Sequence, residues 1–512
     1  MAGKMTLASL FDRADELLTP ANENSMARWA GRCLLLGLVI FALAVPHSIA
    51  AAQIGLSLGV AAWLVRDLAA RRLHFTRTPF DWPLLGFCAL TVVSACASVE
   101  PAVSLPKLRS LTLFALIYLG ATNLRPRAAR LLVMMLVCSG LLGVGFSLGE
   151  KLIGRGMVVT AVNPDSPLVA SELQAGDVIW MVARHRVSSV EEAARVIRGH
   201  RAGERLELEA LHNGDPLPVK LTVTEAMRAQ ANPLGVSVGG RSRRFRVSGF
   251  SRHFITYAEQ MQIFGLLALG LLLAAPRRRL AVPACLLTLF GLTLLLTASR
   301  SVIASFLLAA LVVAAVAGGR RLSLAVIFVV LLLGGAATLV IFATRDRTVV
   351  RFADDSSGRR LSYMRAGLRL IPKHPLFGVG MDAHQRHWKE WGFPGDYVTH
   401  THSTPIQIAL ERGLPALACL VWLVIGMCRQ CWRSYRRAGS ELAGTWLAWL
   451  ALGTFGALLG FSISSLVNYN FGDSEVLMLL LFLIGLVLAI DQEVQLQPAS
   501  RNDAGAINAI GR

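Results

Sequence analysis

Long and nearly uncharged apolar runs recur along this chain, each close to the roughly 20 residues that a helix needs to cross a bilayer. We count twelve, at 30–46, 48–65, 81–98, 110–123, 131–149, 256–275, 280–298, 301–318, 322–343, 413–428, 442–467 and 472–490. Backbone polar groups in hydrocarbon must be satisfied within their own segment, so such runs form helices. With 54% apolar and only 16% charged residues, a soluble or disordered chain is excluded. We therefore expect an α-helical polytopic membrane protein with about 12 transmembrane helices.

The net charge of +19 comes from short clusters of Lys and Arg between the apolar runs, which is a topology signal and not a nucleic-acid footprint. Alternate connections differ sharply in these residues. One set holds Arg66, Arg71, Arg72, Arg77, Arg125, Arg127, Arg130, Arg277, Arg278, Arg279, Arg320, Arg321, Arg429, Arg433, Arg436 and Arg437. The other short connections hold Lys107, Arg109 and Arg300. The positive-inside rule places the first set and both termini in the cytoplasm, and two long inserts, roughly 150–255 and 344–412, on the outer side.

In a Gram-negative inner membrane that outer side is the periplasm, and the chain then divides into seven parts. We expect a cytoplasmic N-terminal segment at 1–29, transmembrane helices 1–5 at 30–149, a periplasmic domain at 150–228, a periplasmic connector and transmembrane helices 6–9 at 229–343, a large periplasmic loop at 344–412, transmembrane helices 10–12 at 413–490, and a cytoplasmic tail at 491–512. All eight cysteines lie in apolar spans or at their basic ends, so no disulfide framework is expected.

The first insert has the pattern of a small α+β domain. Residues 156–182 contain two β-rich stretches separated by an Asn-Pro-Asp-Ser-Pro turn and a short helix. Residues 189–199 have one apolar face at helical spacing, and residues 206–224 form a hairpin pattern around Asn213-Gly214. With its V-x-P-x-S-P and A-G-D-V-I elements, this stretch resembles a bacterial PDZ domain. It departs from that pattern at Ala183-Arg184, where Asn-Gly is usual, and at Glu172, where a small residue is usual.

PDZ domains bind peptides by letting them add a strand beside a groove. We expect the groove to be formed by the run from Leu152 to Val159, where glycines allow close backbone approach. Its candidate residues are Leu152, Ile153, Gly154, Gly156, Met157 and Val158. The resemblance implies a peptide or protein partner; the alternative is a domain that only spaces the two neighbouring spans.

The second insert is basic and rich in histidine, which suits an anionic substrate. It contains Arg345, Arg347, Arg351, Arg359, Arg360, Arg365, His374, His384, His387, His400 and His402. Outside it, Arg300 lies between two spans with hardly any loop. A charge at that depth is costly unless it meets a partner or a water-filled cavity, so it marks a functional position. The alternative for Arg300 is a side chain that extends from a helix end to the interface.

Four segments together resemble the O-antigen ligase and O-antigen polymerase superfamily, over roughly 240–470. They are Arg246-Val-Ser-Gly249, Thr297-Ala-Ser-Arg300, Pro375-Leu-Phe-Gly-Val-Gly380 and His400-Thr-His-Ser-Thr-Pro-Ile-Gln-Ile-Ala-Leu-Glu-Arg-Gly413. Two departures are Ser403, where Asn is usual, and the PDZ insert. The resemblance implies transfer or polymerisation of undecaprenyl-diphosphate-linked glycan at the periplasmic face, without a metal or other cofactor. The acceptor would be a hydroxyl of a glycan, of lipid A core or of a protein.

The chemistry of individual residues suggests their roles in the transfer reaction that this resemblance implies. A departing lipid diphosphate gains negative charge, which the planar fork of Arg matches better than Lys does, so Arg246, Arg300 and Arg365 are the candidate diphosphate ligands. Neutral imidazole suits the base that deprotonates the acceptor hydroxyl, and nearby Arg charges keep it neutral. We assign the base to His402, with His400 as the close alternative. Because a spacing of two would place them about 200° apart on a helix, we do not expect both to face one substrate.

Three further residues of these motifs are assigned supporting roles. Glu411 either orients an arginine or caps the start of span 10. Gly378 and Gly380 belong to the Pro-Leu-Phe-Gly-Val-Gly segment.

The sequence gives weaker support to other classes of protein. A zinc protease needs H-E-x-x-H, which the sequence lacks, and His384-Gln-Arg-His387 has neither its spacing nor its Glu. A metal site made by these two histidines with His400 and His402 stays open. The second hypothesis for function is a non-enzymatic transport or scaffold protein whose PDZ domain recruits a partner. Within the superfamily, the sequence favours ligase and polymerase equally.

Overall fold

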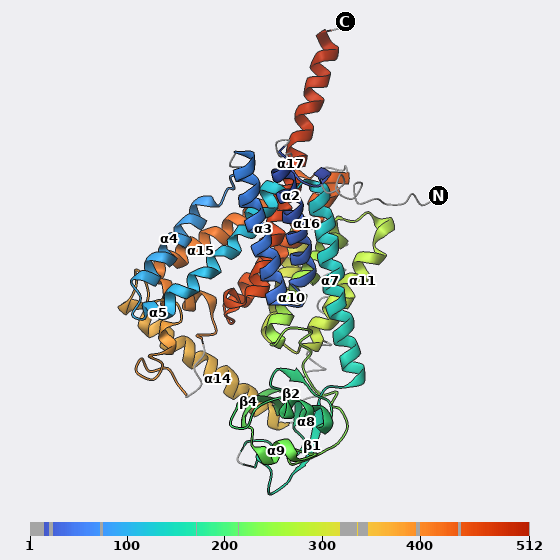
Figure 1. The fold of residues 1–512 in the computed structure, drawn as a ribbon. Coiled ribbons are helices and arrows are strands. Elements are labelled where there is room, and N and C mark those ends of the chain that lie inside the picture. Colours follow the sequence, from blue (N-terminus) through green and yellow to red (C-terminus); the bar gives the residue numbers. More distant parts are fainter. Residues whose placement is uncertain are drawn as a thin grey trace. The chain divides into compact units, whose positions relative to one another are not determined.

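The computed structural model describes residues 15–19, 24–71, 75–169, 171–212, 215–317, 335, 347–395, 400–438 and 442–510 (Figure 1). The chain divides into two compact units. The helical unit consists of Met1–Gly143 and Phe250–Arg512, and the sheet unit consists of Val144–Gly249. Each is described by itself.

The helical unit consists mostly of helices, many of them long and apolar. Their bounds are α2 Ser25–Ala44, α3 Ile49–Ala70, α4 Asp81–Cys96, α5 Pro101–Ser104, η1 Leu105–Phe114, α6 Ala115–Asn123, α7 Pro126–Ile153, α10 Phe254–Ala274, η2 Arg277–Arg279, α11 Ala281–Leu296, α12 Arg300–Ala317, α14 Arg347–Leu370, η3 Ile371–Lys373, η4 Ala383–Gln385, α15 Thr404–Arg437, α16 Leu442–Ser465, η5 Asn470–Gly472 and α17 Ser474–Ile510. The last turns of α7 belong to the sheet unit.

Within the described residues, nine helical segments are long and apolar enough to cross a membrane, and α4 and α11 are shorter apolar helices. Together they cover every apolar run counted in the sequence except 322–343, of which only residue 335 is among the described residues. The prediction of a polytopic helical membrane protein is confirmed.

The helices pack in defined pairs. α2 packs on α3, α10 on α11 and α16, and α15 on α4 and α16. Glycine allows some of these backbones to approach closely: a Cβ added at Gly270 of α10 would lie 2.5 Å from the backbone nitrogen of Gly453 of α16. Such contacts fix α10, α15 and α16, whose ends carry the polar motifs described below.

The sheet unit is an antiparallel sheet with two short helices. The strands are β1 Met157–Val162, β2 Val178–Val182, β3 His185–Arg186, β4 Arg205–His212, β5 Asp215–Thr222 and β6 Val236–Val238, and the helices are α8 Val190–Arg198 and α9 Glu225–Ala229. The strand order is β5-β4-β2-β1-β6, with β3 paired to β2. β4 and β5 form the predicted hairpin, whose turn at 213–214 lies outside the described residues.

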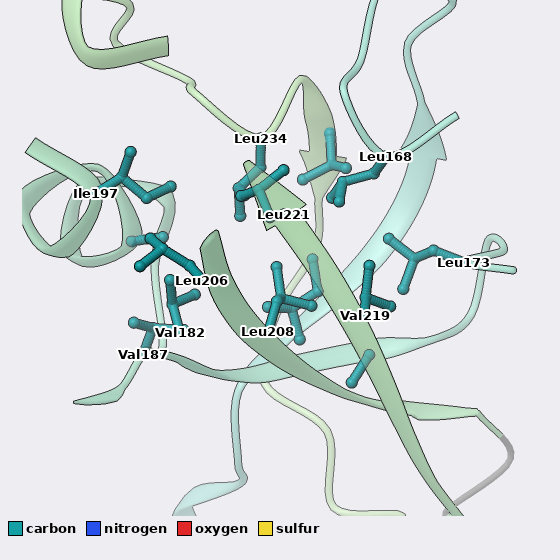
Figure 2. Packing of buried hydrophobic residues seen from close by; sticks show 14 of the residues in the cluster. Leu168, Leu173, Val182, Val187, Ile197, Leu206, Leu208, Val219, Leu221 and Leu234 are labelled. Carbon is teal, nitrogen blue, oxygen red and sulfur yellow. The ribbon is translucent and has the colours of Figure 1, made fainter. Parts of the chain in front are cut away.

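Local sequence explains these elements. Ser189 caps α8 by accepting a hydrogen bond from the backbone N–H of Glu192 at 3.3 Å, and the apolar side of α8 is buried. Ala183 and Arg184 both have positive φ, 46° and 66°, so they make the tight β2–β3 turn that Asn-Gly would make more easily. Figure 2 shows the apolar core of the sheet unit, in which Leu234, from the loop before β6, packs among residues of the other strands.

Candidate functional site

Two of the sequence motifs lie against each other in the helical unit. The backbone N–H groups of Val379 and Gly380 donate hydrogen bonds to the carbonyl oxygens of Leu410 and Glu411, each at 2.9 Å. These carbonyls are available because α15 is broken at Gly413, whose φ and ψ are 83° and 168°. The Pro375–Gly380 segment therefore packs on a helix whose backbone hydrogen bonding is interrupted.

Glycine is required where these segments touch. Gly378 has φ 67°, and an added Cβ would lie 2.3 Å from the carbonyl carbon of Glu411. Gly380 has φ 99°, and its Cβ would lie 1.9 Å from Oγ of Ser98. Both positions exclude a side chain by backbone conformation and by space, which gives the two predicted supporting residues a structural role.

The two candidate bases lie together, so the expectation that they face different directions is wrong. The rings of His400 and His402 are 4.4 Å apart at their centroids, in an edge-to-face arrangement. A left-handed backbone at His402, with φ 55°, folds the loop back on itself. The backbone N–H of His402 consequently donates to Nδ1 of His400 at 3.2 Å.

This hydrogen bond distinguishes the two rings. A neutral imidazole has one N–H and one lone pair, so a ring that accepts at Nδ1 carries its proton on Nε2. His400 is thus a donor through Nε2, and only His402 retains a ring lone pair for accepting a proton.

Both rings are neutral near pH 7. Burial, together with the charges of neighbouring histidines and of Arg360, lowers the pKa of His400 to about 4 and of His402 to about 3. The arrangement provides unprotonated imidazole throughout the physiological pH range.

The charge of Arg360, on α14, acts on both histidines. Tyr363, one helical turn further on the same side of α14, stacks on His402 with ring centroids 5.7 Å apart. Arg360 is partly buried, and its pKa is lowered by that burial and by the charge of Arg300, which begins α12. Arg365 is exposed and rotated by about 140° from Arg360 around α14.

The sequence analysis placed Arg360 in a basic run without choosing it over its neighbours. Only the docking of α14 decides which of several arginines faces the site. The remaining predicted ligand, Arg246, is a partly buried residue of the sheet unit, in the segment after β6.

Gln407 supports the histidine loop from the side of the Pro375–Gly380 segment. Its Oε1 accepts a hydrogen bond from the N–H of Thr401 at 2.8 Å, and its Nε2 donates to Oε1 of Glu411 at 2.7 Å. Glu411 also accepts from the N–H of Asp382 at 3.0 Å. His384, fully buried, lies 3.4 Å from Gln407 through Nε2.

The predicted roles of Glu411 were to orient an arginine or to cap the start of span 10. α15 is broken at Gly413, and the hydrogen bonds of the Glu411 side chain join it to Gln407 and Asp382, not to the helix after the break. Its carboxylate instead joins the histidine loop to the loop at 380–384. Gln407 lies five residues after His402 and was not chosen from the sequence. The one feature that could have marked it is its polar amide near the start of an otherwise apolar helix.

A second polar network supports the loop from the opposite end. Thr404 Oγ1 donates to the backbone oxygen of Asn468 at 3.1 Å and to Oδ1 of Asn470 at 3.0 Å. The amide of Asn470 reaches the fully buried Glu259 at 3.3 Å. The amide of Asn468 donates to Oγ of Ser301 at 3.0 Å, next to the arginine of the Thr-Ala-Ser-Arg motif. This network connects the start of α15 with the start of α12.

Three of the six non-glycine residues with positive φ in the described part of the chain lie in or next to the same motifs. Ala298, Asp382 and His402 are non-glycine residues with φ of 51°, 57° and 55°. They belong to the Thr-Ala-Ser-Arg segment, the loop after Gly380 and the histidine loop, respectively. Such conformations are found mainly where the surrounding structure enforces a functional geometry.

An apolar cavity of about 250 Å³ adjoins the histidine loop. It is lined mainly by leucine, valine and phenylalanine side chains of α15, α16 and α17. Thr404, Ser465 and Phe471 line it as well, and the first two also belong to the second polar network.

The histidines do not converge on a metal site. Among the residues that the structure describes, no three His, Cys, Asp or Glu side chains are grouped to hold a metal ion. His387 instead pairs with Glu390 at 2.7 Å and with Glu100 at 3.3 Å.

The predicted PDZ groove needs correction. Leu152 and Ile153 are the last residues of α7, not part of a strand, and are 73% and 63% exposed. β1 begins at Met157 and is paired on both edges, to β2 and to β6. No edge of β1 is open to a peptide. The sheet also continues past residue 228, where the sequence analysis ended the domain.

The fold and the site define a multi-pass helical membrane protein with a neutral histidine pair under the charge of Arg360 and with an inserted sheet domain. Residues 283–421 match the O-antigen ligase family, and residues 140–223 match the PDZ domain. No curated protein matches the chain. The chain therefore carries an O-antigen ligase domain and a PDZ domain. The ligase domain supports a role in surface polysaccharide biosynthesis and a glycosyltransferase-like activity, and its family belongs to the bacterial inner membrane.

Proposed function

We propose that the protein transfers or polymerises undecaprenyl-diphosphate-linked glycan at the periplasmic face of the inner membrane. The observation that carries this proposal is the neutral His402, which retains a ring lone pair beside Arg360. The O-antigen ligase match over 283–421 supports the choice of reaction.

The proposed step uses His402 as the general base. Its free ring nitrogen accepts the proton of an acceptor hydroxyl, and the hydroxyl oxygen forms a bond to the anomeric carbon of the donor sugar. The bond from that carbon to the diphosphate oxygen breaks, and its electron pair leaves with undecaprenyl diphosphate. A base with a pKa of about 3 is weak, so most of the barrier reduction must come from stabilising the leaving group.

Arginines supply that stabilisation. Arg300 and Arg360 already influence each other electrostatically, and a dianionic diphosphate would relieve their mutual repulsion. Removing one well-placed donor from an oxyanion site costs about 3–4 kcal/mol. Arg246 remains a candidate from its motif. Arg365, being exposed on another side of α14, is a weaker candidate than Arg360.

The donor's lipid chain also has a matching surface. The cavity of about 250 Å³ between α15, α16 and α17 is almost entirely apolar, and Thr404 lines it next to the histidine loop. An isoprenoid chain held there would keep its diphosphate near His402. Since bilayer hydrocarbon is as apolar as the cavity, van der Waals packing and not the hydrophobic effect would hold the chain.

Transfer from a purified lipid-linked donor, with the full-length enzyme in nanodiscs, tests the proposal. His402→Ala is expected to abolish transfer while protein abundance and folding are retained. The matched control is His387→Ala, in the same insert but paired with Glu390 away from the site, and it retains transfer. Arg300→Lys recovers little activity if a bidentate fork is needed.

Full transfer by His402→Ala would refute the base assignment. Absence of transfer by the wild-type protein would favour the alternative, a non-enzymatic transport or scaffold protein. The acceptor needs a separate experiment. Deletion in the native host, followed by gel analysis of lipopolysaccharide, exopolysaccharide and glycoproteins, distinguishes a ligase, a polymerase and a protein-glycosylating enzyme by which product is lost.

A further inference from the structure

The sheet unit ends in residues 242–249, which include the Arg246-Val-Ser-Gly249 motif. Neither family match covers this segment. Its first residue pairs with the chain that enters the domain after α7. The N–H of Arg155 donates to the carbonyl of Ser242 at 2.7 Å, and the N–H of Ser242 donates back at 3.1 Å. The chain that enters the sheet domain and the chain that leaves it are therefore joined within the unit.

One carboxylate and two arginines extend this contact to the end of the motif. Arg155 Nε donates to Oε1 of Glu150 at 2.9 Å, and Arg186 Nη1 donates to the same oxygen at 2.8 Å. Each arginine reaches the motif with another nitrogen. Arg155 Nη2 donates to Oγ of Ser248 at 3.3 Å. Arg186 Nη2 donates to the carbonyl oxygen of Gly249 at 2.9 Å. We call Glu150, Arg155 and Arg186 the Glu150 network.

Most of the Glu150 network is shielded from water. The side chains of Arg155 and Glu150 are only 5% and 11% exposed. The guanidinium of Arg155 lies over the rings of Trp180 and Phe245, 4.8 Å and 4.3 Å from their centroids. Lys151 Nζ adds a hydrogen bond to the carbonyl oxygen of Phe245 at 2.7 Å. Charged hydrogen bonds are stronger where water is excluded, so these contacts hold the segment more firmly than surface ion pairs would.

The backbone of Arg246 lies between these fixed points. The residue before it, Phe245, is held by its carbonyl, and Ser248 is held by its hydroxyl two residues later. Val247, between them, is fully buried. Arg186, which holds the end of the motif, belongs to β3 and pairs through its backbone with β2. The sheet of the domain thus fixes the main chain from which the Arg246 side chain extends.

We propose that the inserted domain positions Arg246 for the donor diphosphate, and that Arg186 is a positioning residue that acts through Arg246. The inference deepens the proposed function and rests on its assignment of Arg246 to the diphosphate. A guanidinium whose backbone is already fixed loses less freedom when it binds phosphate oxygens, so the bound state is favoured. The domain is then part of donor binding and not only a spacer between two spans.

Binding of farnesyl diphosphate to the full chain in nanodiscs, with farnesol as the uncharged reference, tests the proposal. Arg186→Ala should weaken binding of farnesyl diphosphate about tenfold and leave binding of farnesol unchanged. The matched control is Arg228→Ala in the same unit. Its side chain is as exposed as that of Arg186, 37%, and it also pairs with a carboxylate, that of Glu225. Arg228→Ala should bind farnesyl diphosphate like wild type.

A double-mutant cycle distinguishes positioning from direct contact. If Arg186 acts through Arg246, Arg186→Ala should weaken binding no further in a chain that already carries Arg246→Ala. Additive losses would overturn the proposal, because they would mean that Arg186 contacts the diphosphate by itself. Wild-type affinity of Arg186→Ala, or an equal loss in Arg228→Ala, would also overturn it.

Amide exchange gives a second reading that needs no ligand. Arg186→Ala should speed exchange over residues 242–249, and Arg228→Ala should not. Unchanged exchange in Arg186→Ala would refute the inference that Arg186 holds this segment.

The binding data separate this inference from the proposed function. Wild-type affinity of Arg246→Ala would refute the diphosphate assignment of Arg246 and, with it, this inference. A loss in Arg246→Ala without a loss in Arg186→Ala would refute this inference alone. Binding is measured without an acceptor, so absence of glycan transfer does not affect the result.

Discussion

The contact between Gly378 and α15 gives a quantitative test of how the site is held together. Alanine at position 378 must adopt φ 67°, and its Cβ would lie 2.3 Å from the carbonyl carbon of Glu411. The obstacle is backbone, so no side-chain rotation relieves it. The left-handed conformation costs about 1–2 kcal/mol, and overpacking adds about 1–3 kcal/mol.

Gly392→Ala is the matched control. Gly392 has nearly the same φ, 72°, and its added Cβ would have no atom within 4 Å. Both substitutions restrict the unfolded chain equally. Gly392→Ala should therefore cost about 1–2 kcal/mol and Gly378→Ala about 2–5 kcal/mol.

The free energy of unfolding of both variants can be compared by denaturant titration of the full chain in mixed micelles, followed by tryptophan fluorescence. A parallel transfer assay should show a larger loss for Gly378→Ala, because displacing Glu411 also disturbs Gln407 and the histidine loop. Equal destabilisation by the two variants, within about 0.5 kcal/mol, would refute the inference that the Pro375–Gly380 segment docks directly on the broken helix.

Three further predictions concern the histidine pair and the sheet unit. His400→Asn should retain about tenfold more transfer than His400→Ala, because the amide oxygen of Asn can accept the N–H of His402 in place of Nδ1; equal rates would contradict this role. A base acts when deprotonated, so wild-type transfer should be insensitive to base protonation from about pH 5 to 8. Arg360→Gln should raise the pKa of His402, so the pH at which transfer falls off on the acid side should rise. The pKa of His402 should still stay below the usual 6.5, because burial is the larger cause of its shift. If transfer falls off at the same pH as in the wild type, Arg360 does not act on the ring. Arg184→Gly should stabilise the sheet unit by about 1 kcal/mol, measured by thermal unfolding, since φ 66° suits glycine.

Most residues of the candidate site could be chosen from recognisable sequence motifs, but their arrangement in space could not. His402, Arg300, Gly378 and Gly380 were chosen from their motifs, and the structure gives them defined surroundings. Arg360 could not be chosen, because several arginines share one helix and only the stacking of Tyr363 on His402 shows which side of α14 faces the site.

Predictions from regular helical spacing were wrong where the backbone is irregular. Residues two apart lie about 200° apart around a regular helix, yet the rings of His400 and His402 lie together because the two residues belong to a loop in which His402 is left-handed. The groove prediction failed for a related reason. β6 is only three residues long and lies beyond the recognisable PDZ motifs, so no pattern in the sequence marked it as part of the sheet.

The sequence by itself determined which segments are apolar helices and which stretch forms the PDZ domain, because hydropathy and strand periodicity are local properties that each segment carries wherever it packs. It also determined which residue types are present for transfer chemistry. The tertiary structure alone decided which of them meet. The break at Gly413, the positive φ of His402 and the pairing of β6 with β1 each depend on contacts between segments far apart in the chain, and such contacts leave no local pattern from which they could be predicted.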